Sequence, residues 1–317
     1  MSAVAASILV VHRDRKTQRV VQRILGATGL RLDVTDDHEQ AMRLVAQTTP
    51  RLLVLDGADL LQPHGRALVA AAELRGATSC LTLMAADANA EVPRLLATGA
   101  VSNLLVHAMP VLAEELIVTA HKLLRSDIFG LEKYLLWGSE VVARRLTRSQ
   151  ARSALVHELS DHLHAAGQSA RVASMAMLVA DELLSNAVHN APVDAAGVAY
   201  RRDTPRDQDF ALTEREAVAL RWGCDARYVA IEVRDRFGSL RRDTVLAALA
   251  HVRIRETGEG AGMGLALAYR SCDHLVFDLA PGVATECIAL IDVRALPNQR
   301  PSASSYNVFE ATTGPHE

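Results

Sequence analysis

Residues 180–192, Ala-Asp-Glu-Leu-Leu-Ser-Asn-Ala-Val-His-Asn-Ala-Pro, organise the second half of the chain. At helical period, Glu182 and Asn186 share one face, Asn190 follows them, and the apolar residues fall on the opposite side. Pro192 ends the run. The polar face offers a carboxylate, which can activate a hydroxyl, and amides, which can ligate Mg²⁺ beside a polyphosphate. Because this spacing is common, an ordinary solvated face is the alternative for this helix by itself.

The composition limits the classes of protein. With 317 residues, the chain is long enough for two domains with their own cores. A net charge of -3 argues against a general nucleic-acid binder or a binder of anionic membranes. The scattered cysteines fit a reducing compartment and lack zinc-site spacing: Cys80, Cys224, Cys272 and Cys287. With no leader-like start and no transmembrane-length apolar run, we expect a cytoplasmic protein without membrane insertion.

Two stretches after residue 192 combine turns with polar or glycine-rich sequence. Asp235 follows a strand predicted at 228–233 and precedes a turn containing Gly238, so its carboxylate could accept a hydrogen bond from adenine N6. The run 258–264, Gly-Glu-Gly-Ala-Gly-Met-Gly, opens a helix predicted at 265–271. Such glycines let backbone N–H groups approach phosphate oxygens, although many glycine-rich runs are only turns. Each motif is weak by itself, and their order along the chain carries more information.

That order resembles the ATP-binding domain of the GHKL superfamily, which includes gyrase-like ATPases, histidine kinases and anti-sigma-factor serine kinases. The resemblance covers about residues 149–295 and implies an α/β two-layer sandwich of the Bergerat type, with ATP and Mg²⁺ bound. The compact lead-in helix makes the anti-sigma-factor serine kinases the nearest branch. Phe237 and Ser239 stand where the family's aspartate motif has glycines.

The resemblance also implies roles for individual residues. Glu182 would be the general base, and Arg152 would contact the terminal phosphate. Asn186 would ligate Mg²⁺, Asp235 would read adenine, and Thr285 would support Asp235. The nucleotide-binding set is completed by Asn190, Gly238, Gly260, Gly262 and Gly264, of which Gly262 and Gly264 would form the hinge of a phosphate-covering lid.

Short apolar strands alternate with helices through the first half of the chain. Strands are predicted at 7–11, 30–34, 51–55, 80–84 and 101–106, and helices at 15–25, 39–46, 65–74, 90–98 and 111–124. This alternation predicts a five-stranded parallel sheet with helices on both faces and a flavodoxin-like strand order.

Residues 5–125 resemble a response-regulator receiver domain. Asp56, in Pro-Arg-Leu-Leu-Val-Leu-Asp, matches the phospho-accepting aspartate. Receiver chemistry also needs an acidic pair for Mg²⁺, a hydroxyl and a lysine. Here the pair is replaced by His12-Arg13 with Asp14 as the remaining acid, and the hydroxyl position holds Met84. No lysine occurs between Lys16 and Lys122, so we favour a pseudo-receiver, used for docking or dimerisation, over a phosphorylatable domain.

The remaining segments are a joint and a tail. Residues 126–148 are expected to form a connecting helix, and 297–317, rich in Pro, Ser, Thr and Asn, a disordered tail. A helix at 150–165 contains His157-Glu158-Leu159, similar to the phospho-accepting segment of histidine kinases. His157 lies too close before Asn186 for that arrangement, and the proline expected soon after the histidine is missing.

The sequence therefore predicts a signal-transduction protein with a pseudo-receiver at 1–125 and an ATP-binding domain at 149–296. The expected activity is Mg²⁺-dependent phosphorylation of a serine or threonine in a protein partner. Two alternatives stay open, a non-catalytic ATP-binding interaction module and a histidine autokinase. A second copy of the chain is a further expected partner, and nucleic acid is not.

Overall fold

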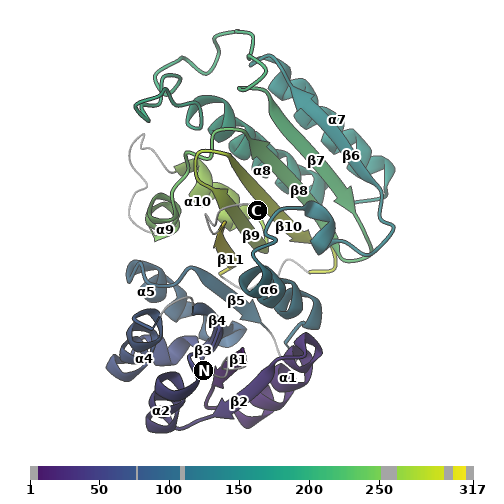
Figure 1. The fold of residues 1–317 in the computed structure, drawn as a ribbon. Helices are drawn as coiled ribbons and strands as arrows, with labels where there is room; N and C mark the ends of the chain where they lie inside the picture. The colour runs from purple at the N-terminus through teal and green to yellow at the C-terminus, as the bar shows by residue number, and fades with distance from the viewer. Residues whose placement is uncertain (1–5, 76–77, 108–110, 251–262, 296–302, 312–317) are drawn as a thin grey trace. The chain divides into compact units, whose positions relative to one another are not determined.

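The computed structural model describes residues 6–75, 78–107, 111–250, 263–295 and 303–311. The chain divides into two compact units (Figure 1). The first comprises Met1–Ile128 with Pro301–Asn307, and the second Phe129–Arg300 with Val308–Glu317. Among the described residues, every helix is too short or too polar to span a bilayer.

The first unit contains a parallel sheet in the predicted order β2-β1-β3-β4-β5. Its strands are β1 (Ser7–Val11), β2 (Arg31–Thr35), β3 (Leu52–Asp56), β4 (Ser79–Ala85) and β5 (Asn103–His107). Its helices are α1 (Arg15–Leu25), α2 (His38–Thr48), α3 (Gly57–Leu60), α4 (Pro63–Glu73), α5 (Val92–Ala97) and α6 (Ala113–Arg125), with 3-10 turns η1 (Gly26–Thr28) and η2 (Ala86–Glu91).

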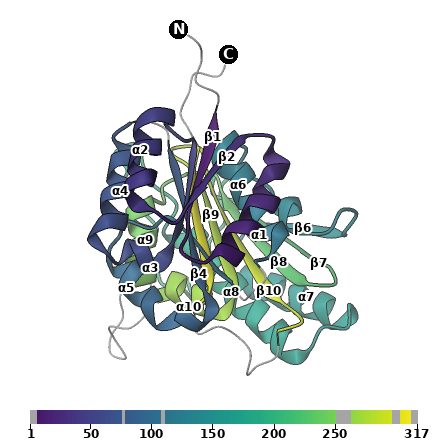
Figure 2. The ribbon, with the colours of Figure 1, turned by 90° about the horizontal axis from the view of Figure 1, so that it is seen from below.

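Helices cover both faces of this sheet. Figure 2 shows α1 and α6 on one side of the strands and α2 and α4 on the other. Every residue of β1, β3 and β5 is buried. Strands buried on both faces need continuous apolar runs, which explains why the sequence pattern predicted this half well.

Residues 303–311 correct the expectation of a disordered tail. They contain β11 (Ser305–Glu310), whose first residues pair antiparallel with β5 through Tyr306 opposite Leu104 and Asn307 opposite Asn103. The fully buried Tyr306 donates its hydroxyl to the carbonyl oxygen of Val101 at 2.7 Å. The polar composition of 297–317 concealed this strand because its pairing partner is remote in sequence.

The second unit contains an antiparallel sheet in the order β9-β10-β8-β7-β6. The strands are β6 (Val141–Leu146), β7 (Val218–Cys224), β8 (Tyr228–Asp235), β9 (His274–Ala280) and β10 (Ala284–Asp292). The helices are α7 (Ala151–Ala165), α8 (Ala170–His189), α9 (Arg242–Ala250) and α10 (Met263–Ser271), with η3 (Leu131–Tyr134). Helix α8 packs against α7, α10 and the central strands.

The connecting helix expected at 126–148 is wrong. This segment forms the turn η3 and the strand β6, which pairs with β7 through Val142 opposite Trp222 and Leu146 opposite Val218. The apolar spacing also suited a helix, but β-branched residues paired with a buried neighbouring strand favour the extended form. Between α8 and β7, an isolated bridge pairs Val193 with Ala199.

Candidate functional site

Helix α8 presents Glu182 and Asn186 on a partly buried polar face. The opposite face is packed into the core through Val179, Ala180, Leu183, Leu184, Ala187 and Val188. Asn190, the C-cap residue, donates its Nδ2 to Oδ1 of Asn186 at 2.7 Å. Within the described ranges, Nδ2 of Asn186 is buried without a hydrogen-bond partner. The amide of Asn186 is thus positioned by Asn190 and retains an unused donor.

The glycine-rich run reaches this face through Gly264. A Cβ atom at Gly264 would lie 2.4 Å from Oε2 of Glu182 and 3.4 Å from Nδ2 of Asn186. A side chain at this position would therefore require the Glu182 carboxylate to move, whereas glycine lets the first turn of α10 lie close to both side chains. Gly260 and Gly262 lie outside the described residues. Gly264, Glu182 and Asn186 therefore lie close together in the fold.

Asp235 ends β8 as a buried carboxylate. Its Oδ1 accepts the N–H groups of Phe237 at 2.8 Å and Gly238 at 3.1 Å. Burial raises the pKa of the Asp235 carboxyl, and these N–H groups act in the opposite direction. Thr285 lies directly across the ladder from Asp235, with its hydroxyl oxygen buried. Thr285 also acts to lower the pKa of Asp235, against the effect of burial, so the two residues are neighbours in the fold.

The turn after Asp235 is pressed against the β9–β10 hairpin. Gly238 has a φ of +58°, and a Cβ there would lie 2.1 Å from the carbonyl oxygen of Ala280. The next residue, Ser239, donates its hydroxyl to the carbonyl oxygen of Ala191 at 2.8 Å. This bond joins the Asp235 turn to the end of α8, directly after Asn190.

Glu182 is surrounded by charged groups, of which Arg152 was a candidate from the sequence and Arg206 was not. Nε of Arg152 lies 2.8 Å from Oδ1 of Asp181. Arg206, which no periodic pattern marked, donates to the hydroxyl of Ser185 at 2.6 Å. Burial and Asp181 raise the pKa of Glu182, while Arg152 and Arg206 oppose the shift. A carboxylate flanked by two arginines suits a site that handles both a proton and an anion.

The histidine considered as a phospho-acceptor is exposed on α7. Nδ1 of His157 lies 2.7 Å from the carbonyl oxygen of Ser153, one turn earlier on the same helix. This contact lies within α7 and gives the histidine autokinase alternative no support.

In the first unit, Asp56 is buried at the end of β3 and paired with an arginine. Nε of Arg13 lies 2.9 Å from Oδ2 of Asp56, and Nη2 of Arg13 lies 2.9 Å from Oδ1 of Asp59. Nε2 of His12 lies 4.0 Å from Asp56. A guanidinium therefore pairs with the carboxylate that the sequence resemblance matched to a receiver phospho-acceptor.

Asp14 and Met84 also have structural roles here. Asp14, expected as the remaining Mg²⁺ acid, caps α1 by accepting from the N–H and hydroxyl of Thr17 at 2.9 and 2.7 Å. These hydrogen bonds lower the pKa of Asp14 to about 2. Cε of Met84 would lie 2.6 Å from a Cβ at Gly57, so a thioether packs over the residue after Asp56.

Comparisons with known proteins add structures of two response regulators. No protein-family model and no curated protein matches the sequence. The response regulator receiver protein from Burkholderia phymatum is 21% identical over 38% of this chain and 94% of its own, with a TM-score of 0.31. The Legionella pneumophila response regulator LqsR is 11% identical over 95% of this chain and 92% of its own, with a TM-score of 0.30. Both TM-scores are low, and the fold of the first unit is defined by its own strand order.

Proposed function

We propose that this chain is a signalling protein whose second unit, of the GHKL type with a Bergerat fold, binds Mg-ATP and phosphorylates a serine or threonine of a protein partner. The observation that carries the proposal is the approach of Gly264 to Glu182 and Asn186. It is supported by the Ser239–Ala191 hydrogen bond and by the pairing of Thr285 with Asp235. Residues remote in sequence are thus grouped as a shared nucleotide site requires.

Each residue has a role that follows from its chemistry. Glu182 would take the proton of the attacking hydroxyl, a role helped by the raised pKa that burial produces. Asn186 would hold Mg²⁺, whose charge offsets that of the triphosphate, and Asp235 would accept from the adenine amino group. Arg152 and Arg206 would balance negative charge near Glu182.

The first unit would act as a pseudo-receiver. The Arg13 guanidinium holds the place of an exchangeable cation beside Asp56, and Met84 replaces the hydroxyl. Regulation would then come from a bound protein or a second copy of the chain, without phosphorylation of Asp56.

A non-catalytic ATP-binding module is the second candidate. It is favoured by the Asn190–Asn186 hydrogen bond, which occupies the amide oxygen that Mg²⁺ would need, and by the Arg152–Asp181 ion pair. The histidine autokinase is a third option, and it predicts acid-labile phosphate on His157.

The test separates binding from chemistry. ATP affinity would be measured by calorimetry with Mg-ATP, and turnover by release or transfer of label from γ-labelled ATP. Both would be measured for Glu182→Gln, Asp235→Asn and the control Asp243→Asn, an exposed aspartate of α9. We expect Glu182→Gln to lower turnover by about 10²-fold or more with little change in ATP affinity. Asp235→Asn should weaken ATP binding by about tenfold or more, because its buried acceptor is altered.

Several results would decide against this scheme. Equal loss of affinity and turnover in Glu182→Gln would remove the base role, and unchanged affinity in Asp235→Asn would remove the adenine contact. ATP binding without turnover in the unmodified chain would select the non-catalytic module.

A further inference from the structure

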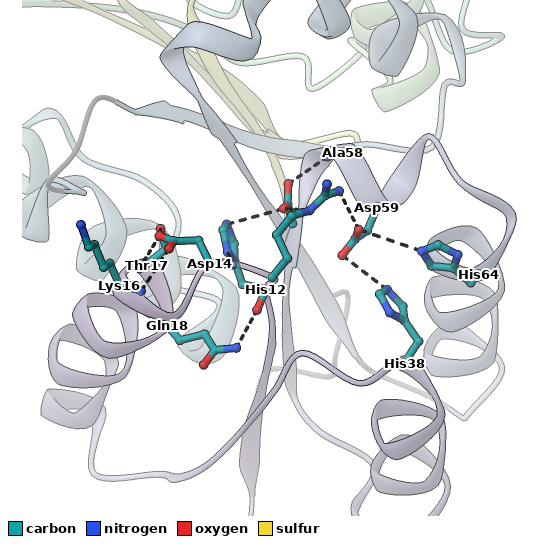
Figure 3. A network of polar contacts seen from close by, with 11 residues as sticks. His12, Asp14, Lys16, Thr17, Gln18, His38, Ala58, Asp59 and His64 are labelled. Atoms are coloured by element: carbon teal, nitrogen blue, oxygen red, sulfur yellow. Dashed lines mark hydrogen bonds and ion pairs between the residues drawn. The ribbon is translucent and has the colours of Figure 1, made fainter.

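Three side chains of the first unit lie close together: His38, Asp59 and His64 (Figure 3). Asp59 is also paired with Arg13. One ligand atom from each of the three lies within 4.8 Å of the other two. Nε2 of His38 is 3.4 Å from Oδ2 of Asp59, and Nε2 of His64 is 4.0 Å from Oδ1 of the same carboxylate. In the described part of the chain, this is the one group of at least three such residues with metal-ligand spacing.

Local structure holds the three residues in place. Asp37 caps α2, which makes His38 its first residue, and Pro63 starts α4 one residue before His64. Asp59 belongs to the short helix α3. A Cβ at Gly65 would lie 2.1 Å from the carbonyl oxygen of Asp59, so the start of α4 is in backbone contact with α3. The cluster is therefore built on rigid helix starts.

Two atoms of the cluster are buried without hydrogen-bond partners among the described residues, Oδ2 of Asp59 and Nε2 of His38. Asp59 is 5% exposed, and its other oxygen, Oδ1, already accepts from Arg13 at 2.9 Å. Burying a carboxylate oxygen or an imidazole nitrogen without a hydrogen-bond partner costs free energy. A cation between these atoms would satisfy both, and a direct hydrogen bond from Nε2–H of His38 to Asp59 is the competing explanation.

We propose that His38, Asp59 and His64 bind Zn²⁺ or a similar divalent transition metal. Two imidazoles and one carboxylate suit such a metal, whereas Mg²⁺ prefers oxygen ligands alone. Bonds of about 2.0–2.2 Å in a tetrahedron separate ligand atoms by roughly 3.3–3.6 Å, a range that includes the His38–Asp59 distance of 3.4 Å. His64, with half its side chain exposed, can close the remaining gap by a small rotation and leaves the fourth position open to water. The site is distinct from the Asp56 position, which Arg13 holds.

The experiment uses the full chain after removal of metal with a chelator. Calorimetric titration with ZnCl₂ and visible spectra with CoCl₂ would be recorded for the unmodified chain, His64→Gln, and His38→Gln combined with His64→Gln. His157→Gln, at an exposed histidine of α7, is the matched control. We expect one equivalent of Zn²⁺ bound by the unmodified chain and by the control. The double variant should lose affinity by more than the roughly 10–100-fold typical of second-sphere changes.

Folding and competing ligands are controlled separately. His64 is half exposed, so its variant should keep the circular dichroism and thermal midpoint of the unmodified chain in EDTA. Zn²⁺ should raise the thermal midpoint of the unmodified chain and not that of the double variant. The proposal is overturned if the unmodified chain binds no Zn²⁺, if the double variant binds it equally well, or if cobalt shows thiolate charge-transfer bands, which would place the metal on a cysteine.

Discussion

The guanidinium of Arg13 lies between two buried carboxylates, 2.9 Å from Asp56 and 2.9 Å from Asp59. Burial opposes its charge, but the two carboxylates outweigh that cost and raise the pKa of Arg13. A covalently attached cation cannot exchange with Mg²⁺ or leave when a phosphoryl group arrives.

Asp14 provides a prediction at the scale of one residue. Asp14→Ala removes the N-cap of α1 and should lower the free energy of unfolding by about 1 kcal/mol. Because the folded pKa is about 2 against an ordinary 3.8, this contribution is complete above pH 3.8 and is lost as the pH falls towards 2. Urea unfolding followed by circular dichroism measures it. The exposed neighbour Asp36→Ala is the control, and equal losses at both positions would contradict the capping role.

At the scale of elements, the polar face of α8 depends on its neighbours. The start of α10 approaches it through Gly264, and Ser239 joins its end to the turn after β8. Helical spacing brings Glu182 and Asn186 together without help from the rest of the fold. Packing decides what lies opposite them, which turns a polar face into a candidate site.

The turn after β8 is a sensitive element. Gly238→Ala should destabilise the second unit by about 3 kcal/mol or more, because a left-handed residue would also place its Cβ 2.1 Å from the carbonyl oxygen of Ala280. Gly282→Ala, in the adjacent hairpin turn, has a φ of +73° but no atom within 4 Å, and should cost only about 1 kcal/mol. Fluorescence of the buried Trp222 during urea unfolding reports the difference. Similar losses for the two variants would mean that the turn relaxes away from the hairpin.

At the scale of a whole unit, buried carboxylates tie the start of η3 and the residue before it to the central sheet of the second unit. Glu286 accepts from the N–H of Gly130 at 2.7 Å, and Glu232 accepts from the N–H of Leu131 at 3.1 Å. Nη1 of Arg221 lies 3.1 Å from Glu232. Burial and the charge of Glu286 nevertheless raise the pKa of Glu232 to about 7. The fold therefore carries an acid that ionises near neutral pH.

The raised pKa of Glu232 predicts how the free energy of unfolding depends on pH. Since the folded pKa of Glu232 lies above its ordinary 4.5, the free energy of unfolding should fall by about 3 kcal/mol as pH rises from about 4.5 to about 7, and then level off. Glu232→Gln should remove that slope, as measured by urea unfolding at several pH values with Trp222 fluorescence. Glu158→Gln, on the surface of α7, should retain it. An unchanged slope in Glu232→Gln would assign the titration to other groups.

The sequence by itself determined the alternation of elements in the first unit and the facing pair Glu182 and Asn186. Both follow from local periodicity, because strands buried on two faces need unbroken apolar runs and helix neighbours recur every turn. The family resemblance implied that Thr285 supports Asp235 and that Gly264 belongs to the same site as Glu182, and each of these pairs is close in the fold.

Only the tertiary structure decided the rest. Strands β6 and β11 form because partners far away in sequence, β7 and β5, offer paired edges to segments whose own patterns suggested a helix and a loose tail. The convergence of His38, Asp59 and His64 likewise depends on which helix starts become neighbours. Such contacts lie between remote residues, so no local period in the chain records them.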